Sequence, residues 1–402
     1  MTTAQSFLTK GLPLLFRDHP HATVGTWLLA TGGAVVGMIH VGGVTRLTQS
    51  GLSMTDWSPL GSLPPIGKDE WEAEFARYKQ FPEWQQRKSM TMEEFQYIYY
   101  WEYGHRMLGR CVGVLFCGPW LYFSLRGKIP AGYQGRMALL ATMGGTQGLV
   151  GWWMVKSGLG DDRRGDRNQI RVKPVRLATH LSMAVATYGA LLWTGFSVLS
   201  LPHNKTLQSL DLASKIPQAL RHSFKLRTAA LAMTGLTAVT IVSGALVAGS
   251  DAGRAYNTFP MMDGHWIPPE IWERVPWHRN LVENTATVQW NHRILGTTTA
   301  LTAASIVLVG LSPSRAALVT PQVRKGLYAL GLATGTQFSL GVATLLHYVP
   351  LSLAAAHQLG SIAVFTSGVY LVHALRYARP ALLRSTGRVL PPPPSALKQA
   401  AH

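Results

Sequence analysis

Long runs of hydrophobic residues without charged side chains recur along the chain. They cover residues 19–45, 137–155, 177–204, 228–250 and 294–314. Each run is close to the length of about 20 residues that spans the hydrocarbon core of a bilayer. Residues 326–375 contain no Asp, Glu, Lys or Arg and are long enough for two spans that turn near 347–350. A further span at 106–125 begins with polar residues, so the pattern predicts an all-α integral membrane protein with eight transmembrane helices.

A segment from the first half of the sequence returns in the second half. Residues 102–109, EYGHRMLG, reappear as residues 289–296, QWNHRILG. Three further pairs follow the same order: the ends of the first helices (41–43 and 247–249), the third helices (146–151 and 336–341) and a Pro-Pro step in each outer loop (64–65 and 268–269). Because four spans return the chain to its starting side, we expect two parallel four-helix-bundle repeats.

The repeats divide the chain into five segments. We expect an N-terminal segment (1–21), a first four-helix repeat (22–200), an inner linker (201–225), a second four-helix repeat (226–376) and a basic, Pro-rich tail (377–402). Within the first repeat, residues 46–101 form a long outer loop. There, Thr91 followed three residues later by Glu94 is typical of a capping box, so we predict a helix that begins at this point and runs into the second span.

The positive charge of the chain is concentrated on one side of the membrane. The formal net charge is +18, and nearly all of the excess lies in the loops on the side of the two termini. The positive-inside rule assigns that side to the cytoplasm or mitochondrial matrix, although a basic stretch at 156–176 is an exception. We therefore expect membrane lipid, and not nucleic acid, as the partner of this charge. Cys111 and Cys117 lie too far apart on one predicted helix to form a disulfide.

Four histidines occupy equivalent positions of the two repeats. His105, His180, His292 and His357 all lie near the outer ends of helices that run in the same direction. Two such helices can place one imidazole on each face of a flat ring, which is the arrangement of a haem with two axial histidines. Zinc normally requires three or four protein ligands, and no third ligand recurs in both halves. Because ionisable groups inside membranes are costly and usually functional, we predict two bis-histidine haem sites.

Three arginines lie close to these histidines. Arg106 and Arg293 directly follow His105 and His292, and Arg110 lies one helical turn beyond Arg106. Guanidinium groups pair well with carboxylates, so these arginines are suited to bind haem propionates. They are equally suited to extend to the membrane interface. The sequence leaves both roles open.

The two repeats differ at one acidic position. Glu102 lies three residues before His105 on the same helix face, and it matches Gln289. A carboxylate beside a haem can accept a proton, whereas Gln289 cannot titrate. We therefore predict that the first half holds the reactive site and the second half a permanent redox haem. The alternative is that Glu102 is an interfacial charge like Glu93 and Glu94.

Four motifs resemble the haem A synthase family of the mitochondrial and alphaproteobacterial type. They are residues 42–53 (GGVTRLTQSGLS), 101–110 (WEYGHRMLGR), 147–159 (QGLVGWWMVKSGL) and 288–296 (VQWNHRILG). The resemblance extends over residues 22–376. It implies an oxidoreductase that converts the C8 methyl group of haem O, through hydroxylated intermediates, to the formyl group of haem A for cytochrome c oxidase.

The resemblance also implies roles for individual residues. His292 and His357 hold a haem b cofactor, His105 and His180 present the haem O substrate, and Glu102 takes part in catalysis. Some bacterial relatives have a cysteine pair in the first outer loop, and this loop contains none. A mechanism that depends on such a thiol pair is therefore not expected.

The expected location and partners follow from the same resemblance. The location is the mitochondrial inner membrane, with a bacterial plasma membrane as the alternative. Haem O synthase, cytochrome c oxidase assembly factors and an external electron acceptor are expected partners, and homo-oligomerisation is left open. Two other functions fit the same histidines: a diheme b-type electron-transfer cytochrome that leaves both haems unchanged, and a haem O chaperone without catalytic activity.

Overall fold

A computed structural model describes residues 20–58, 60–160, 170–201 and 217–378. Within these ranges the chain is helical and forms no strand. Most of the predicted N-terminal segment and tail lie outside the described residues, as do the centre of the basic stretch at 156–176 and much of the inner linker.

Long helices make up the body of the described chain. They are α2 (Ala22–Leu47), α4 (Met92–Leu125), α5 (Gln134–Leu159), α6 (Pro174–Leu199), α8 (Pro217–Gly249), α10 (Thr285–Leu311), α11 (Pro321–Leu346) and α12 (Leu351–Ala374). Seven helices in the described part of the chain, all of these except α5, are long and apolar enough to cross a membrane. The prediction of an all-α membrane protein is therefore confirmed.

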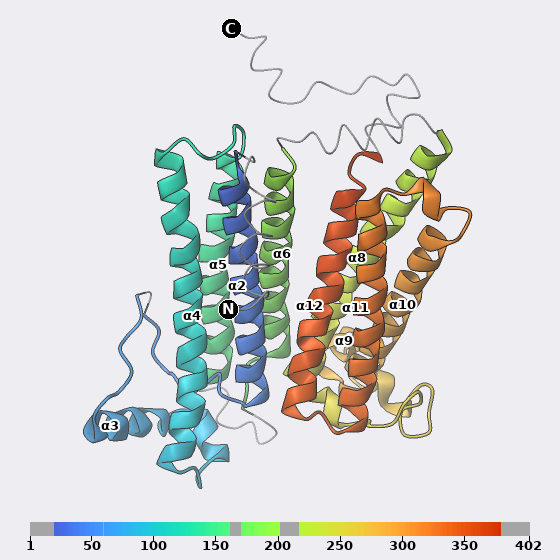
Figure 1. The fold of residues 1–402 in the computed structure, drawn as a ribbon. Coiled ribbons are helices and arrows are strands. Elements are labelled where there is room, and N and C mark those ends of the chain that lie inside the picture. Colours follow the sequence, from blue (N-terminus) through green and yellow to red (C-terminus); the bar gives the residue numbers. More distant parts are fainter. Residues whose placement is uncertain (1–19, 59, 161–169, 202–216, 379–402) are drawn as a thin grey trace, which may run out of the picture.

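The long helices form two bundles that lie side by side (Figure 1). In the first bundle α2 packs against α4 and α6, and α5 packs against the same two helices. In the second bundle α8 packs against α10 and α12, and α11 packs against those two. The bundles meet where α2 and α6 contact α8 and α12.

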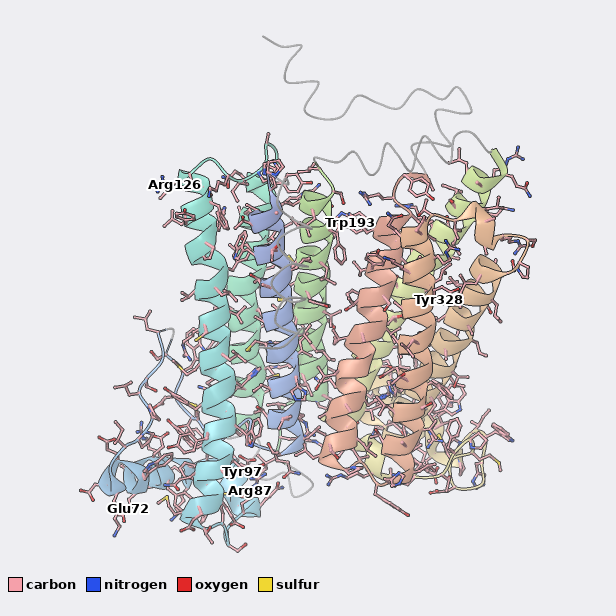
Figure 2. The ribbon with its side chains drawn as sticks, viewed as in Figure 1. Glu72, Arg87, Tyr97, Arg126, Trp193 and Tyr328 are labelled. Atoms are coloured by element: carbon pink, nitrogen blue, oxygen red, sulfur yellow. The ribbon has the colours of Figure 1, made fainter. Side chains whose placement is uncertain are left out.

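The interface between the bundles is mainly apolar and contains a few polar contacts. Its buried cluster consists of Ile39, Val185, Tyr188, Leu192, Ile241, Ile362, Phe365 and Val369. The hydroxyl groups of Tyr188 and Thr366 are 2.7 Å apart. The side-chain amide of Gln358 donates to the backbone oxygen of Ile39 on α2, at 3.0 Å. On α6, Trp193 lies beside the second bundle (Figure 2), with its ring centre 5.0 Å from that of His373 on α12.

The outer loop of the first half folds into a small helical unit at the start of α4. It contains α3 (Lys68–Tyr78) and the 3-10 helix η1 (Pro82–Gln86). Thr91 and Glu94 form the predicted capping box, and α4 then continues without a break into the predicted span. The unit has its own buried cluster, which consists of Met54, Trp71, Phe75, Tyr78, Phe95, Ile98 and Tyr99. Burial of these aromatic rings holds the loop against α4.

The outer loop of the second half lies at the same end of the molecule (Figure 1). It contains short helices only: η3 (Ala252–Arg254), η4 (Pro269–Trp272), η5 (Trp277–Arg279) and α9 (Asn280–Glu283). Asp251 joins this loop to the first half through two ion pairs. Its carboxylate oxygens lie 3.0 Å from the guanidinium group of Arg46 and 2.5 Å from that of Arg171. At the opposite end of the molecule, η6 (Ala316–Leu318) lies between α10 and α11.

Candidate functional site

The four predicted histidine ligands lie on four helices, two in each bundle. His105 is on α4 and His180 is on α6, whereas His292 is on α10 and His357 is on α12. The ring centres of His292 and His357 are 6.4 Å apart, and the ring planes are nearly perpendicular at 89°. The helices that carry His105 and His180 belong to the first bundle, and those that carry His292 and His357 belong to the second. Each predicted pair therefore lies inside one bundle.

The spacing of His292 and His357 fits two imidazoles that bind one metal ion from opposite sides. A ring nitrogen binds a transition metal at about 2 Å, so two opposed rings have their centres roughly 6 Å apart. The observed separation of 6.4 Å agrees with this value. The described residues form no group of three or more His, Cys, Asp or Glu that could hold a metal ion. The pair therefore suits haem, in which the porphyrin supplies the other four ligands, better than zinc.

A glycine of a neighbouring helix lies against each of the four histidines. A Cβ atom added to any of these glycines would be only 2.8–3.0 Å from the Cε1 atom of the histidine ring. The four pairs are Gly42 with His105, Gly151 with His180, Gly244 with His292 and Gly341 with His357. Each imidazole therefore occupies the space that a side chain would fill if the glycine were replaced by any other residue.

These contacts correct the predicted alignment of the two first helices. The sequence pattern matched Gly42 to Ala248, but Gly42 contacts its histidine as Gly244 does. The ends of the helices agree with this register, because Gln49 and Asp251 both have positive φ angles, 55° and 52°. The predicted match was therefore wrong by one helical turn.

His292 has a hydrogen-bond partner on the helix that carries its glycine. The hydroxyl oxygen of Ser243 lies 2.7 Å from His292 Nδ1. The same hydroxyl is 2.8 Å from the backbone oxygen of Thr240, to which it donates. Since a hydroxyl has one hydrogen, its oxygen accepts from Nδ1–H. The Nε2 atom of His292 is then unprotonated and able to bind a metal.

Glutamines lie beside the other member of each pair. The side-chain amide of Gln147 donates to the backbone oxygen of His180 at 3.0 Å and lies 3.2 Å from its Nδ1. Gln337 lies 3.5 Å from Nε2 of His357. The Nδ1 atoms of His105 and His357 are buried, and no described residue forms a hydrogen bond with them.

Glu102 is buried and holds the beginning of the outer loop. Its side chain accepts hydrogen bonds from the Ser53 hydroxyl at 2.8 Å and the Met54 backbone N–H at 2.9 Å. It also forms an ion pair with Arg106 at 2.6 Å. These three donors suit an ionised carboxylate. Glu102 is only 2% exposed, unlike the exposed Glu93 and Glu94.

Gln289 takes the place of Glu102 in the second bundle with a similar set of contacts. Its side-chain oxygen accepts from Arg293 at 3.1 Å, and its amide donates to the backbone oxygen of Ala252 at 2.7 Å. The contact of Gln289 with Arg293 in the second bundle therefore corresponds to that of Glu102 with Arg106 in the first, but the acid is replaced by a neutral side chain.

The three arginines bind backbone oxygens of the outer loops. Arg106 donates to Met54 and Asp56, at 2.8 and 2.7 Å. Arg293 donates to Tyr256 and Thr258, at 2.7 and 2.8 Å, and Arg110 donates to Ser58 at 2.6 Å. They fasten the outer loops to α4 and α10, and propionate binding by these arginines stays a prediction.

Several residues of the site were not singled out from the sequence. Ser53 lies within the 42–53 motif, so the motif itself was a signal for it. Ser243 and Asp251 belong to no motif, and their partners are remote in sequence. Only the packing of helices reveals them.

Comparison with known proteins identifies close relatives over nearly the whole chain. The family model described as "Cytochrome oxidase assembly protein", COX15-CtaA, matches residues 25–369. The chain is 43% identical over 383 residues to "Heme A synthase COX15" of Arabidopsis thaliana, which covers 94% of this chain and 81% of that protein. It is 43% identical over 356 residues to "Heme A synthase COX15" of Homo sapiens, covering 88% and 82%. It is 40% identical over 365 residues to "Heme A synthase" of Paracoccus denitrificans, covering 90% of each chain.

Proposed function

The chain belongs to the COX15-CtaA family of cytochrome oxidase assembly proteins, and from this membership we propose that it is a haem A synthase. As such it is an oxidoreductase that converts the C8 methyl group of haem O to the formyl group of haem A. The names of the relatives support this proposal. The observation that carries it to this chain is the pair of bis-histidine arrangements, of which only one has a buried acid beside it.

We place the two haem sites in two parallel four-helix repeats, residues 22–200 and 226–376. Under this proposal α5 is the eighth membrane span. It has 26 residues, like α2 and α6, and packs between α4 and α6 as α11 packs between α10 and α12. Relatives from plants, animals and bacteria are consistent with a mitochondrial inner membrane or a bacterial plasma membrane. We favour the mitochondrial inner membrane.

His292 and His357 would hold haem b in the second bundle. The support for this assignment is their 6.4 Å ring separation and the hydrogen bond from His292 Nδ1–H to Ser243, which orients Nε2 away from that partner. When bound there, haem b supplies one-electron redox chemistry. Gln289 beside His292 cannot exchange a proton, which suits a site that only transfers electrons.

His105 and His180 would hold the haem O substrate in the first bundle, with Glu102 as a proton acceptor. Conversion of the methyl group to a formyl group with oxygen from one water releases four electrons and four protons. Glu102 is suited to accept protons one at a time and pass them to the outer face. Ser53, Met54 and Arg106 hold its carboxylate in place. The electrons pass to an external acceptor.

Identification of the haems in the purified protein tests this proposal. The protein is isolated in detergent after co-expression with a source of haem O, and the extracted haems are identified by mass. A synthase contains haem b together with haem O, its hydroxylated form or haem A. A protein that contains haem b alone would be an electron-transfer cytochrome, and one that contains haem O but never haem A would be a chaperone.

A further inference from the structure

Ser243 distinguishes the ligand set of the second bundle from that of the first. We propose that the hydrogen bond between Ser243 and His292 makes the second site a permanent haem site, and that the absence of its counterpart lets the first site release haem. This inference rests on the proposed function, because it assumes that His292 and His357 hold the cofactor and that His105 and His180 hold the substrate.

The first step of the argument concerns the position that matches Ser243. Ser243 directly precedes Gly244, the glycine that contacts His292. In the first bundle the residue before the equivalent glycine, Gly42, is Val41. Valine has no polar atom in its side chain, so the first bundle lacks this acceptor. In agreement, His105 Nδ1 is buried and has no hydrogen-bond partner among the described residues.

The second step concerns what such a hydrogen bond does to a metal ligand. A partner on the second ring nitrogen fixes the tautomer and orientation of a metal-binding histidine and raises its basicity. Loss of such a partner typically lowers metal affinity by about 10-fold to 100-fold. Ser243 is itself fixed by its bond to Thr240, so its oxygen always presents a lone pair to Nδ1–H. His292 in the second site is therefore an oriented, more basic ligand, whereas the matching ligand of the first site, His105, has no such partner.

The third step connects this difference with turnover. A cofactor must remain bound through many cycles, whereas the product of the first site must leave after each cycle. A weaker ligand in the first bundle shortens the residence time of the product. Both halves have the same histidine ligands and the same glycines in contact with them. The hydrogen bond therefore gives the two histidine pairs different affinities for haem although the ligands are the same.

The experiment measures haem transfer from purified protein to an excess of apomyoglobin. The transferred haem is identified by mass, which separates haem b from haem O and haem A. The variants are S243V, which copies the matched residue of the first half, S243T, which keeps the hydroxyl, and the reciprocal V41S. T228A is the control, because Thr228 is on α8 and its exposed hydroxyl bonds only to its own helix. Reductive titration gives the midpoint potential of haem b in each variant.

We expect S243V to release haem b about 10-fold to 100-fold faster than the unaltered protein. Its haem b potential should be more positive, because a less basic ligand stabilises ferric iron less. S243T should restore both values, and V41S should slow the release of haem O or haem A. Equal release rates and potentials in S243V, S243T and the unaltered protein would overturn the inference.

A further variant, H292A, separates this inference from the proposed function. If H292A keeps its haem b, the assignment of that haem to His292 is wrong and the proposed function fails at this point. If H292A loses haem b while S243V retains it like the unaltered protein, only the role of Ser243 is wrong. If S243V protein is unfolded, S243T and V41S still test the hydrogen bond, since both carry a hydroxyl at the position in question.

Discussion

Substitution of Gly341 by alanine should weaken the binding of haem b in the second bundle. The added Cβ would lie 2.8 Å from Cε1 and 3.3 Å from Nδ1 of His357. Carbon atoms in contact are normally about 3.5–4.0 Å apart, so the ring must move by roughly 0.7–1.2 Å. Metal–ligand distances tolerate changes of about 0.2 Å. The imidazole would therefore leave the position in which it lies 6.4 Å from its partner ring.

The size of the effect follows from the cost of inserting a methyl group into packed space. Such insertions typically cost about 1–3 kcal/mol. If the displaced ligand bears this cost, haem b affinity falls by about 5-fold to 150-fold, at 1.4 kcal/mol per factor of ten. The folded chain without haem can relax around the methyl group, so most of the loss should appear in binding and less in stability.

The matched control is G335A on the same helix. A Cβ added to Gly335 meets no atom within 4 Å, so this variant adds the same methyl group to α11 without touching a ligand. The assay is the ratio of haem b to protein after purification, together with the rate of haem b transfer to apomyoglobin. The reasoning is refuted if G341A keeps the haem b content and transfer rate of the unaltered protein, or if G335A loses haem b as readily as G341A.

Three further predictions concern the acidic residues. E102Q should keep both haem sites occupied, because Gln289 shows that glutamine can bind the equivalent arginine. Haem A formation should nevertheless fall by about 10²-fold to 10⁴-fold. If E102Q forms as much haem A as the unaltered protein, Glu102 has no role in catalysis. Burial raises the pKa of Glu83 from 4.5 to about 7 despite the nearby Arg87 (Figure 2), so the folded protein retains a proton that the unfolded chain has lost. The outer loop should therefore lose stability as pH rises from about 4.5 to about 7, and E83Q should flatten this dependence in limited proteolysis. D251N should lower the free energy of unfolding by about 1 kcal/mol, because Arg46 and Arg171 lose their shared ion-pair partner. Thermal unfolding at low and at high salt measures this loss. A loss of stability that does not depend on salt would contradict the ion-pair explanation.

The positions of the helices could be predicted because lipid imposes a simple rule on sequence. Charged residues are largely excluded from the spans, so each apolar run lies mostly within a long helix. The helices α4 and α8 nevertheless begin well before their apolar runs. The start of α4 could also be predicted, since the capping box of Thr91 and Glu94 is a local signal. By contrast α5, which contains the predicted span at residues 137–155, carries Arg136 near its start and Lys156 near its end. It is not among the described helices that are apolar enough to cross a membrane.

The register of the first helices and the contacts of the outer loops could not be predicted. Small residues recur every helical turn between Gly244 and Gly249. A sequence alignment of the two first helices can therefore be shifted by one turn and still match a glycine of one helix to a glycine of the other. Contact with a histidine on another helix removes this ambiguity. The partners of Glu102 and Asp251 are likewise set by tertiary packing, since Ser53 and Arg46 are remote from them in the chain.

The hydrogen bond from Gln358 to α2 shortens the route between the two bundles. Gln358 is the neighbour of His357 in sequence, and its amide reaches the backbone of Ile39, three residues before the glycine that contacts His105. A chain of covalent bonds interrupted by one hydrogen bond therefore leads from His357, a proposed ligand of haem b, to the helix that contacts His105, a proposed ligand of haem O. Electrons leaving the substrate would have a tunnelling pathway that runs entirely through protein and crosses no lipid.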